Sequence, residues 1–355
     1  MNFQLLSVSI LSTMLAACGG GGSTVATSGG TGTSTSATNT ASPTTNSGNL
    51  ATSAPTPTYP AGSFQLAMFN QLNDVRLKGG FGMLAQDVVL DKADTNHANY
   101  LVTNYYNFVG QYGLQWNPDM SKVDPATGWL QAHVEVEGKP GFTGVLPVNR
   151  VASAGSTYSY IGEVIAFISP PAPPTDCVGV LLNTVFHRNA LLNTQLSTIG
   201  IGYSPTPDSK SGACVINPSM KSTPNIRPEG WTGIYPGENQ TSVPTGMGGE
   251  APDPAPNIPN SQKGSPVSIY LNSALASVNS FTLTAAGSTV QVPTVQLTYA
   301  DFPKYLTKNE AHILPTQLLA SKTTYKVNFA GTMSDGTITN RRSLFFVPYN
   351  HFCER

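Results

Sequence analysis

Charge is what this 355-residue chain lacks most: 10% of its residues are Asp, Glu, Lys or Arg, against about 25% in an average globular protein. The 18 basic and 19 acidic residues leave a formal net charge of −1. Without a basic excess to neutralise phosphates, the composition argues against nucleic acid as a partner. The chain also lacks an acidic run that would indicate a solvating tail. Its 34 glycines and 28 prolines favour turns, linkers and β structure over long helices.

The N-terminal segment has no charged side chain at all, because the first one in the chain is Asp74. Residues 3–17 form an apolar stretch that is too short to span a membrane and has the length of a signal-peptide core. The stretch ends in Leu15-Ala16-Ala17-Cys18, which resembles the lipobox of bacterial lipoproteins. No Lys or Arg precedes it, so the α-amino group alone supplies the positive charge unless the natural start lies elsewhere.

The lipobox resemblance implies that residues 1–18 are a signal segment and that the Cys18 thiol carries a diacylglycerol. Two acyl chains are enough for stable anchoring, so the membrane is an expected partner. Gly19, rather than Asp, follows the cysteine, and in Gram-negative cells this pattern is similar to that of lipoproteins sent to the outer membrane. We therefore expect a lipid-anchored protein of the cell envelope, at the outer membrane.

Residues 19–60 contain almost no large apolar side chains and no charge. Such a Ser/Thr/Gly segment buries too little surface to offset the entropy of ordering, so we interpret it as a disordered linker. About forty residues of this composition have a root-mean-square reach of roughly 35 Å.

Apolar residues recur at helical spacing from Phe64 to Val75, and the pattern stops at Gly79-Gly80. Further elements alternate along the next 140 residues: helices are predicted at 90–104 and 177–192, and paired strands at 199–203 and 213–216. This alternation predicts a domain of mixed α and β structure over residues 61–220.

Helical periodicity disappears beyond about Pro224, where Pro and Gly clusters bracket short alternating runs. The predicted strands are 267–271, 281–284, 290–292 and 325–329. Asp335-Gly336 is a strong hairpin signal before Thr337-Ile338. Short strands at this spacing predict an antiparallel β-sandwich over residues 224–355.

Five motifs of the first domain, in order, resemble those of the CAP superfamily (SCP/PR-1-like). They are Leu72-Asn-Asp-Val-Arg76; Asp94-Thr-Asn-His-Ala-Asn-Tyr100; His133-Val-Glu135 with Pro140-Gly-Phe-Thr-Gly144 and Asn149-Arg150; Ile161-Gly-Glu163; and Phe186-His187-Arg188 with Ile199-Gly-Ile-Gly202. The resemblance covers residues 64–217 and implies a CAP-type α-β-α sandwich.

The second domain is similar to bacterial immunoglobulin-like modules, through Tyr235-Pro236, Gly249-Glu-Ala-Pro-Asp-Pro254 and Thr323-Thr-Tyr-Lys-Val327. In that last segment the Tyr325 hydroxyl is expected to fix a corner of the sandwich. The predicted fold class is therefore α+β, a CAP-type sandwich followed by an all-β Ig-like sandwich.

The CAP resemblance implies a cleft that gathers His133, Glu163 and His187. The family has a further Glu on the helix before the second His, and residues 178–185 contain none. Glu135 lies two residues from His133 in a predicted extended segment and therefore points to the same side. We interpret Glu135 as a substitute for the missing carboxylate, which is our own inference and not the pattern of the family.

Two imidazoles with one or two carboxylates can bind a divalent metal such as zinc. They can also act as a general base with its orienting acid, or form a buried hydrogen-bonded network that holds loops together. The sequence contains no G-x-S-x-G elbow and no HExxH motif. His97, on the apolar face of its helix, is interpreted as a core histidine, and Arg76 as a structural hydrogen-bond donor.

The preferred hypothesis is a tethered binding protein that holds a small apolar ligand, a divalent metal, or a lipid or other cell-envelope component. The alternatives are a hydrolase with a cleft histidine as general base, and a structural or adhesive surface protein. The absence of an evident nucleophile favours binding over catalysis, and no cofactor is identified.

Four cysteines suit an exported protein. With Cys18 lipidated, Cys177 opens the third predicted helix and Cys214 lies in a following strand, so we expect these two to form a disulfide. Cys353 is then unpaired or bonded to another chain.

Overall fold

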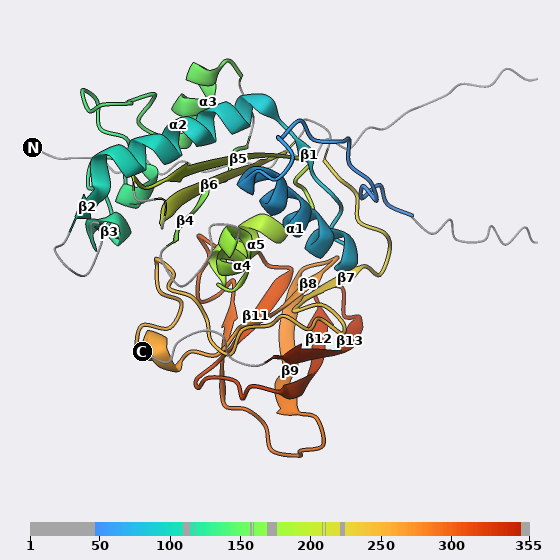
Figure 1. Ribbon diagram of the computed structural model, residues 1–355. Helices are drawn as coiled ribbons and strands as arrows, with labels where there is room; N and C mark the ends of the chain where they lie inside the picture. The colour runs from blue at the N-terminus through green and yellow to red at the C-terminus, as the bar shows by residue number, and fades with distance from the viewer. Residues whose placement is uncertain are drawn as a thin grey trace, which may run out of the picture. The chain divides into compact units, whose positions relative to one another are not determined.

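The computed structural model describes residues 47–348, except 109–113, 117, 157, 159, 169–175, 208, 210 and 221–223 (Figure 1). All described residues belong to one compact unit. Cys18, most of the predicted linker, His351 and Cys353 lie outside the described residues, so the lipidation and the state of Cys353 stay predictions.

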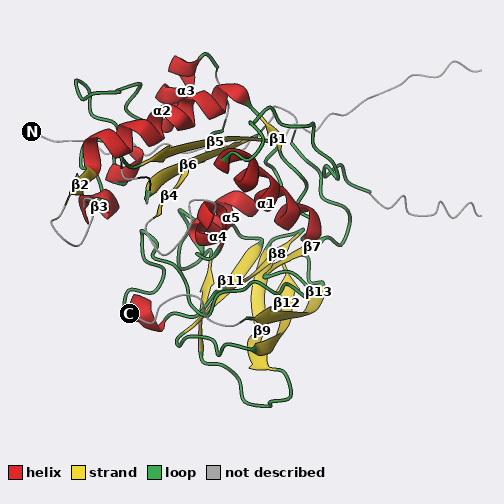
Figure 2. Ribbon diagram, viewed as in Figure 1, coloured by secondary structure: helices red, strands yellow, loops and turns green. Residues whose placement is uncertain are grey.

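The fold is mixed α and β, as the sequence predicts. The helices are α1 Phe64–Lys78, α2 Val88–Tyr105, α3 Pro147–Ala154, α4 Cys177–Leu182 and α5 Phe186–Leu192, with short 3₁₀ turns at Pro118–Ser121, Gln131–His133 and Asn260–Gln262. Strands of the first region are β1 Ala85–Gln86, β2 Tyr106–Phe108, β3 Leu114–Trp116, β4 Val164–Ile168, β5 Thr198–Pro205 and β6 Gly212–Ser219. Strands of the second region are β7 Thr232–Tyr235, β8 Val267–Leu271, β9 Leu275–Ala285, β10 Thr294–Thr298, β11 Glu310–Pro315, β12 Thr323–Met333 and β13 Ile338–Val347. Figure 2 shows the α-helices gathered around the first sheet.

Both N-terminal helices start at side-chain caps. Ser63 accepts a hydrogen bond from the Leu66 amide (3.2 Å), and Asp87 accepts one from the Val89 amide (2.9 Å). Such caps satisfy amides that have no partner within the helix. Helix α1 ends at Gly79, where the sequence predicts its end.

The single helix predicted over 177–192 is in fact two helices, α4 and α5. The Thr184 hydroxyl donates to the Leu181 carbonyl (2.8 Å), and the Glu250 carboxylate accepts the backbone amides of residues 185–187. A carboxylate at this position caps a new helix, so the chain turns and restarts. This cap comes from a distant segment, which local periodicity does not reveal.

The first sheet has the strand order β1-β5-β6-β4, with β5, β6 and β4 antiparallel and β1 parallel to β5. Side chains of β6 alternate between its two faces. Cys214 and Ile216 pack with α1, α4 and α5, whereas Ala213 and Val215 pack with α2. The sheet is therefore covered by helices on both faces, as Figure 1 shows.

Two glycines of β5 explain how closely α2 approaches the sheet. A Cβ atom at Gly200 would overlap Leu90, and one at Gly202 would overlap the Asp94 backbone. The Ile199-Gly-Ile-Gly202 motif is thus a packing requirement of the α2–β5 contact.

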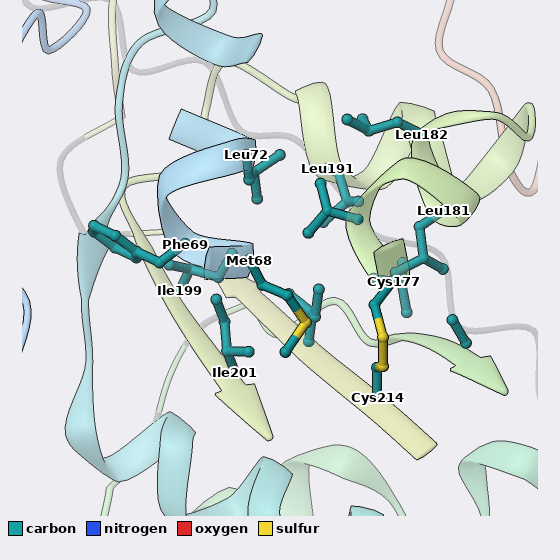
Figure 3. Packing of buried hydrophobic residues seen from close by; sticks show 14 of the residues in the cluster. Met68, Phe69, Leu72, Cys177, Leu181, Leu182, Leu191, Ile199, Ile201 and Cys214 are labelled. Atoms are coloured by element: carbon teal, nitrogen blue, oxygen red, sulfur yellow. A yellow bond between two sulfur atoms is a disulfide. The ribbon is translucent and has the colours of Figure 1, made fainter. Parts of the chain in front are cut away.

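The predicted disulfide between Cys177 and Cys214 is present (Figure 3). It joins the start of α4 to β6, across 37 residues and a Cα–Cα distance of 6.4 Å. The bond lies inside the apolar cluster that α1, α4 and α5 form against the sheet.

The second region is a β-sandwich of two antiparallel sheets, β10-β11-β8-β7 and β13-β12-β9. Its core lies between the sheets and is built mainly from apolar side chains, among them Val267, Phe281 and Val327. The Asp335-Gly336 turn joins β12 to β13, and Gly336 has a φ of 85°, which glycine adopts readily. The predicted strand at 290–292 forms only an isolated bridge, between Gln291 and Thr284.

The expected tyrosine contact is also present, because the Ala320 amide donates to the Tyr325 hydroxyl over 2.8 Å. This bond fixes the approach to β12, the central strand of the smaller sheet.

The sheet of β8 and β11 is covered on both faces. Val267, Ile269 and Leu271 enter the sandwich core, whereas Ser268 and Tyr270 face the first region. Arg188 of α5 donates to the Ser268 hydroxyl over 2.9 Å and lies 4.5 Å from the ring centroid of Tyr235. Both strands are therefore buried along their whole length, and the two regions share a seam.

Residues 47–60, the end of the predicted linker, pack against the first region. The Asn49 amide donates to the Ile226 carbonyl and the Met83 amide to the Ala51 carbonyl, each over 2.8 Å. The Tyr59 hydroxyl donates to Asp91 over 2.6 Å. Residues 47–60 thus belong to the folded part of the chain. None of the helices in the described part of the chain is long and apolar enough to cross a membrane.

Candidate functional site

His133 and Glu163 come together as predicted. His133 ends the 3₁₀ turn at 131–133, Glu163 immediately precedes β4, and 2.9 Å separate His133 Nδ1 from Glu163 Oε1. The Glu163 side chain is fully buried, whereas that of His133 is 12% exposed. The pair therefore runs from the interior to the surface.

Arg150 of α3 holds the Glu163 carboxylate in place. Its Nη2 lies 2.7 Å from Oε1 and 2.6 Å from Oε2. Burial alone would raise the pKa of Glu163, but Arg150, His97 and His133 outweigh it and hold that pKa well below its ordinary value. Because Glu163 is ionised, His133 donates its Nδ1–H to it, and Nε2 is the nitrogen left for another partner.

Glu135 faces a different histidine from the one that the sequence suggests. Its carboxylate contacts His97 Nδ1 over 2.9 Å and accepts the Thr143 amide over 2.6 Å and the Gly144 amide over 3.3 Å. Burial would raise the pKa of Glu135, but His97 and Thr143 lower it overall. Glu135 is therefore an internal anchor for the turn at 143–144.

His97 is a buried core histidine, as we interpret it from the sequence. Its Nε2 lies 2.9 Å from the Ala132 carbonyl, directly before His133, and 3.9 Å from Glu163 Oε1. Burial and Arg150 lower the pKa of His97, while Glu163 and Glu135 oppose that change. His97 ties α2 to the turn that presents His133.

Arg150 connects the two halves of this network. Its Nη1 donates to the His133 carbonyl over 3.1 Å, and its Nε lies 3.9 Å from Glu135 Oε1. One guanidinium thus fixes both the backbone of His133 and the carboxylate that orients its ring. We call Arg150, Glu163, Glu135 and His97 the buried charge network.

His187 is not joined to this network. It lies on α5, in the helix layer on the other side of the first sheet, and its Nδ1 is 2.9 Å from Glu250 Oε1. No hydrogen bond or ion pair between described residues links it to His133, Glu135 or Glu163. Its partner Glu250 sits in the connection between β7 and β8, so His187 belongs to the helix cap described above.

The donor atoms also do not suit a metal. Arg150 takes both oxygens of Glu163, and His97 and Thr143 occupy those of Glu135. No group of three or more His, Cys, Asp or Glu side chains between residues 47 and 348, the masked positions aside, is arranged to hold a metal ion. The residues present therefore do not fit the zinc expectation.

An exposed aromatic side chain lies beside His133. Trp129 meets its ring edge to face, with ring centroids 5.9 Å apart, and is itself 40% exposed. Val136 and Val148, close in sequence to Glu135 and Arg150, are also exposed. We call His133 and Trp129 the His133 surface.

Sequence reasoning misses the roles of Arg150, His97 and Glu250. Arg150 and Glu250 stand inside the quoted motifs, but nothing in the sequence names their partners. The sequence indicates that His97 is buried, but it does not reveal the link to Glu135.

Comparison with known proteins adds little information about this site. No protein-family model matches the chain, and no curated protein matches it. Among solved structures it is similar to an outer surface protein from Borrelia burgdorferi, with 17% identity and a TM-score of 0.32 over 46% of this chain and 97% of that one. It is also similar to CopC from Methylosinus trichosporium OB3b (16%, TM-score 0.23, 34% and 94%) and to PcoC, a copper resistance protein from Escherichia coli (14%, TM-score 0.21, 32% and 94%). These scores are too low to carry an argument about fold or function.

Proposed function

We propose that this chain is a non-catalytic binding protein, a CAP-type domain followed by an immunoglobulin-like domain, which holds a small amphipathic ligand at the His133 surface. The observation that carries the proposal is the position of His133. It is the one partly exposed end of a network whose other four members are buried and paired.

Support for the CAP assignment comes from what its motifs do. Asn73 exchanges hydrogen bonds with the Leu84 backbone, and Arg76 donates to the Gly82 carbonyl (2.6 Å) and the Leu191 carbonyl (2.6 Å). The glycines of β5 admit α2, and helices cover both faces of the sheet. These contacts support the proposed α-β-α arrangement.

Support for the immunoglobulin-like assignment comes from strand order. If β7 to β13 are lettered A to G, the two sheets read A-B-E-D and C-F-G. That order is the one of constant-type immunoglobulin domains, and the Tyr325 contact at the start of strand F matches their tyrosine corner.

The chemistry of the His133 surface suits an amphipathic molecule. His133 Nε2 offers one hydrogen bond to a polar head group, and the exposed indole of Trp129 offers apolar surface beside it. Glu163 and Arg150 fix the imidazole ring, so little side-chain entropy is lost when the ligand binds.

Hydrolysis receives no specific support. Among the described residues, no Ser, Thr or Cys side chain forms a hydrogen bond with His133. Thr184 contacts His187, but its hydroxyl donates to the Leu181 carbonyl and His187 faces Glu250, so this contact is not an activated nucleophile.

The binding proposal is tested with a fluorescent fatty acid titrated into the full chain. Wild type is expected to bind it saturably, and His133→Ala and Trp129→Ala are each expected to weaken binding at least tenfold. Tyr299→Ala is the matched control, because Tyr299 has similar exposure on the β-sandwich. Equal binding by wild type and both surface variants would contradict the proposal.

The tether is part of the same proposal and rests on the lipobox alone. Cys18→Ala is expected to release the protein from the membrane fraction and to abolish incorporation of labelled palmitate. If the variant stays in the membrane fraction as fully as wild type, the protein is not anchored through Cys18.

A further inference from the structure

A cavity lies at the seam between the two regions, away from the His133 surface. Its volume is about 170 Å³, and the segment after α5 borders it on one side and β8 and β11 on the other. Its lining residues include the two ionisable side chains Glu310 and Arg227 and the aromatic side chains Tyr270 and Trp231.

Tyr270 forms part of the wall of this cavity. The residue is 5% exposed, and its hydroxyl is buried on the side of Ser268, away from solvent. The Ser268 hydroxyl is itself engaged with Arg188 and His312. Tyr270 therefore contributes its ring to the cavity wall.

Glu310 contributes a buried carboxylate, 3% exposed. It accepts the Thr307 amide over 2.6 Å and is hydrogen-bonded to Asn189, but it forms no ion pair with any Lys, Arg or His of the described chain. Burial raises the pKa of Glu310 to about 7, because it outweighs these hydrogen bonds and the charge of Arg227, which lower that pKa.

Arg227 provides the opposite charge. Its guanidinium donates to two neutral carbonyls, Leu271 (2.8 Å) and Asn272 (3.2 Å), and lies 5.4 Å from the Trp231 ring centroid. It forms no ion pair with Glu310, although both line the cavity. One cavity therefore carries a carboxylate and a guanidinium that do not neutralise each other directly.

We propose that this cavity binds a small zwitterion of the α-amino acid class, with its ammonium group at Glu310 and its carboxylate at Arg227. Such a ligand compensates both charges at once. The site does not depend on the His133 surface or on its proposed ligand.

The test is calorimetric titration of the full chain with glycine and L-serine at pH 8, where Glu310 is ionised. Saturable binding and a raised melting temperature are expected. Ethylammonium and acetate, which each carry one of the two charges, are expected to bind at least tenfold more weakly. Glycerol, a neutral polar molecule of comparable size, is expected not to bind.

Two variants assign the binding to this cavity. Glu310→Gln is expected to weaken glycine binding at least tenfold. Arg227→Gln removes the guanidinium charge that would face the ligand carboxylate, so it is also expected to weaken glycine binding at least tenfold. Tyr299→Phe, outside the cavity, is the control and should bind glycine as wild type does.

Absence of binding by either amino acid would overturn the proposal. It would also be overturned if acetate alone bound as tightly as glycine, which would indicate a simple anion site, or if glycerol bound instead. Binding of glycine that both cavity variants left unchanged would place the amino acid elsewhere.

Discussion

The helix-and-sheet region and the β-sandwich bury charge in different places. The first region holds its buried charge network inside its own layers, between α2, α3 and the sheet. The core of the sandwich is built mainly from apolar side chains, and the buried polar groups Glu310, His312 and Ser268 lie on the opposite face of its larger sheet, toward the seam.

This difference indicates that buried charge has a different role in each region. Burying charged groups costs several kcal/mol per ion unless geometry and hydrogen bonds compensate. In the first region, this cost accompanies a network that holds the His133 imidazole at the surface. The core of the sandwich is built mainly from apolar side chains and therefore does not incur it. Substitution of ionisable groups should therefore change stability most in the first region and at the seam.

The largest expected effect is loss of Arg150. Arg150→Met leaves Glu163 charged and buried without its partner, so the free energy of unfolding should fall by about 3–5 kcal/mol. Urea denaturation measures this change in the free energy of unfolding. Lys78→Met, which breaks the exposed pair with Asp74, should change stability little. Similar effects of the two variants would mean that the network does not carry the stability of the first region.

Loss of the disulfide should have the next largest effect on stability. Replacing Cys177 and Cys214 together with Ser removes a cross-link across 37 residues, which in the chain-entropy model stabilises by about 4 kcal/mol. Denaturation of wild type with and without reductant is the parallel measurement. If the double variant matched the oxidised protein in stability, the cross-link would contribute nothing.

Glu310 should make the seam sensitive to pH. Its folded pKa of about 7 exceeds its ordinary 4.5, so the stability it contributes is complete below pH 4.5 and is lost as pH rises through 7. The shift corresponds to at most about 3 kcal/mol. Glu310→Gln should thus match wild type at pH 4 and exceed it at pH 8. A constant difference between the two would show that the Glu310 carboxylate does not titrate in this way.

The sequence is most informative where structure is local. The helix from Phe64, the strand at 267–271 and the Asp335-Gly336 turn all follow from spacing and turn chemistry. The disulfide partners can be predicted because few cysteines are available.

The candidate site can be predicted only in part. His133 and Glu163 pair as predicted, but Glu135 turns to His97 and His187 turns to Glu250. The order of the motifs indicates the region to which each residue belongs. The hydrogen-bond partner of each side chain depends instead on which distant segments pack against it. The break between α4 and α5 has the same cause, because Glu250 lies some 63 residues from the helix it caps.

The central claim is that His133, and not His187, is the ligand contact. Titration of the same fluorescent fatty acid into His133→Ala and His187→Ala tests it most directly. The account predicts that His133→Ala loses at least tenfold in affinity and keeps its fold. It predicts that His187→Ala binds as wild type does but melts at a lower temperature, because the Glu250 contact is gone. Equal losses of affinity in the two variants, or a loss only in His187→Ala, would contradict it.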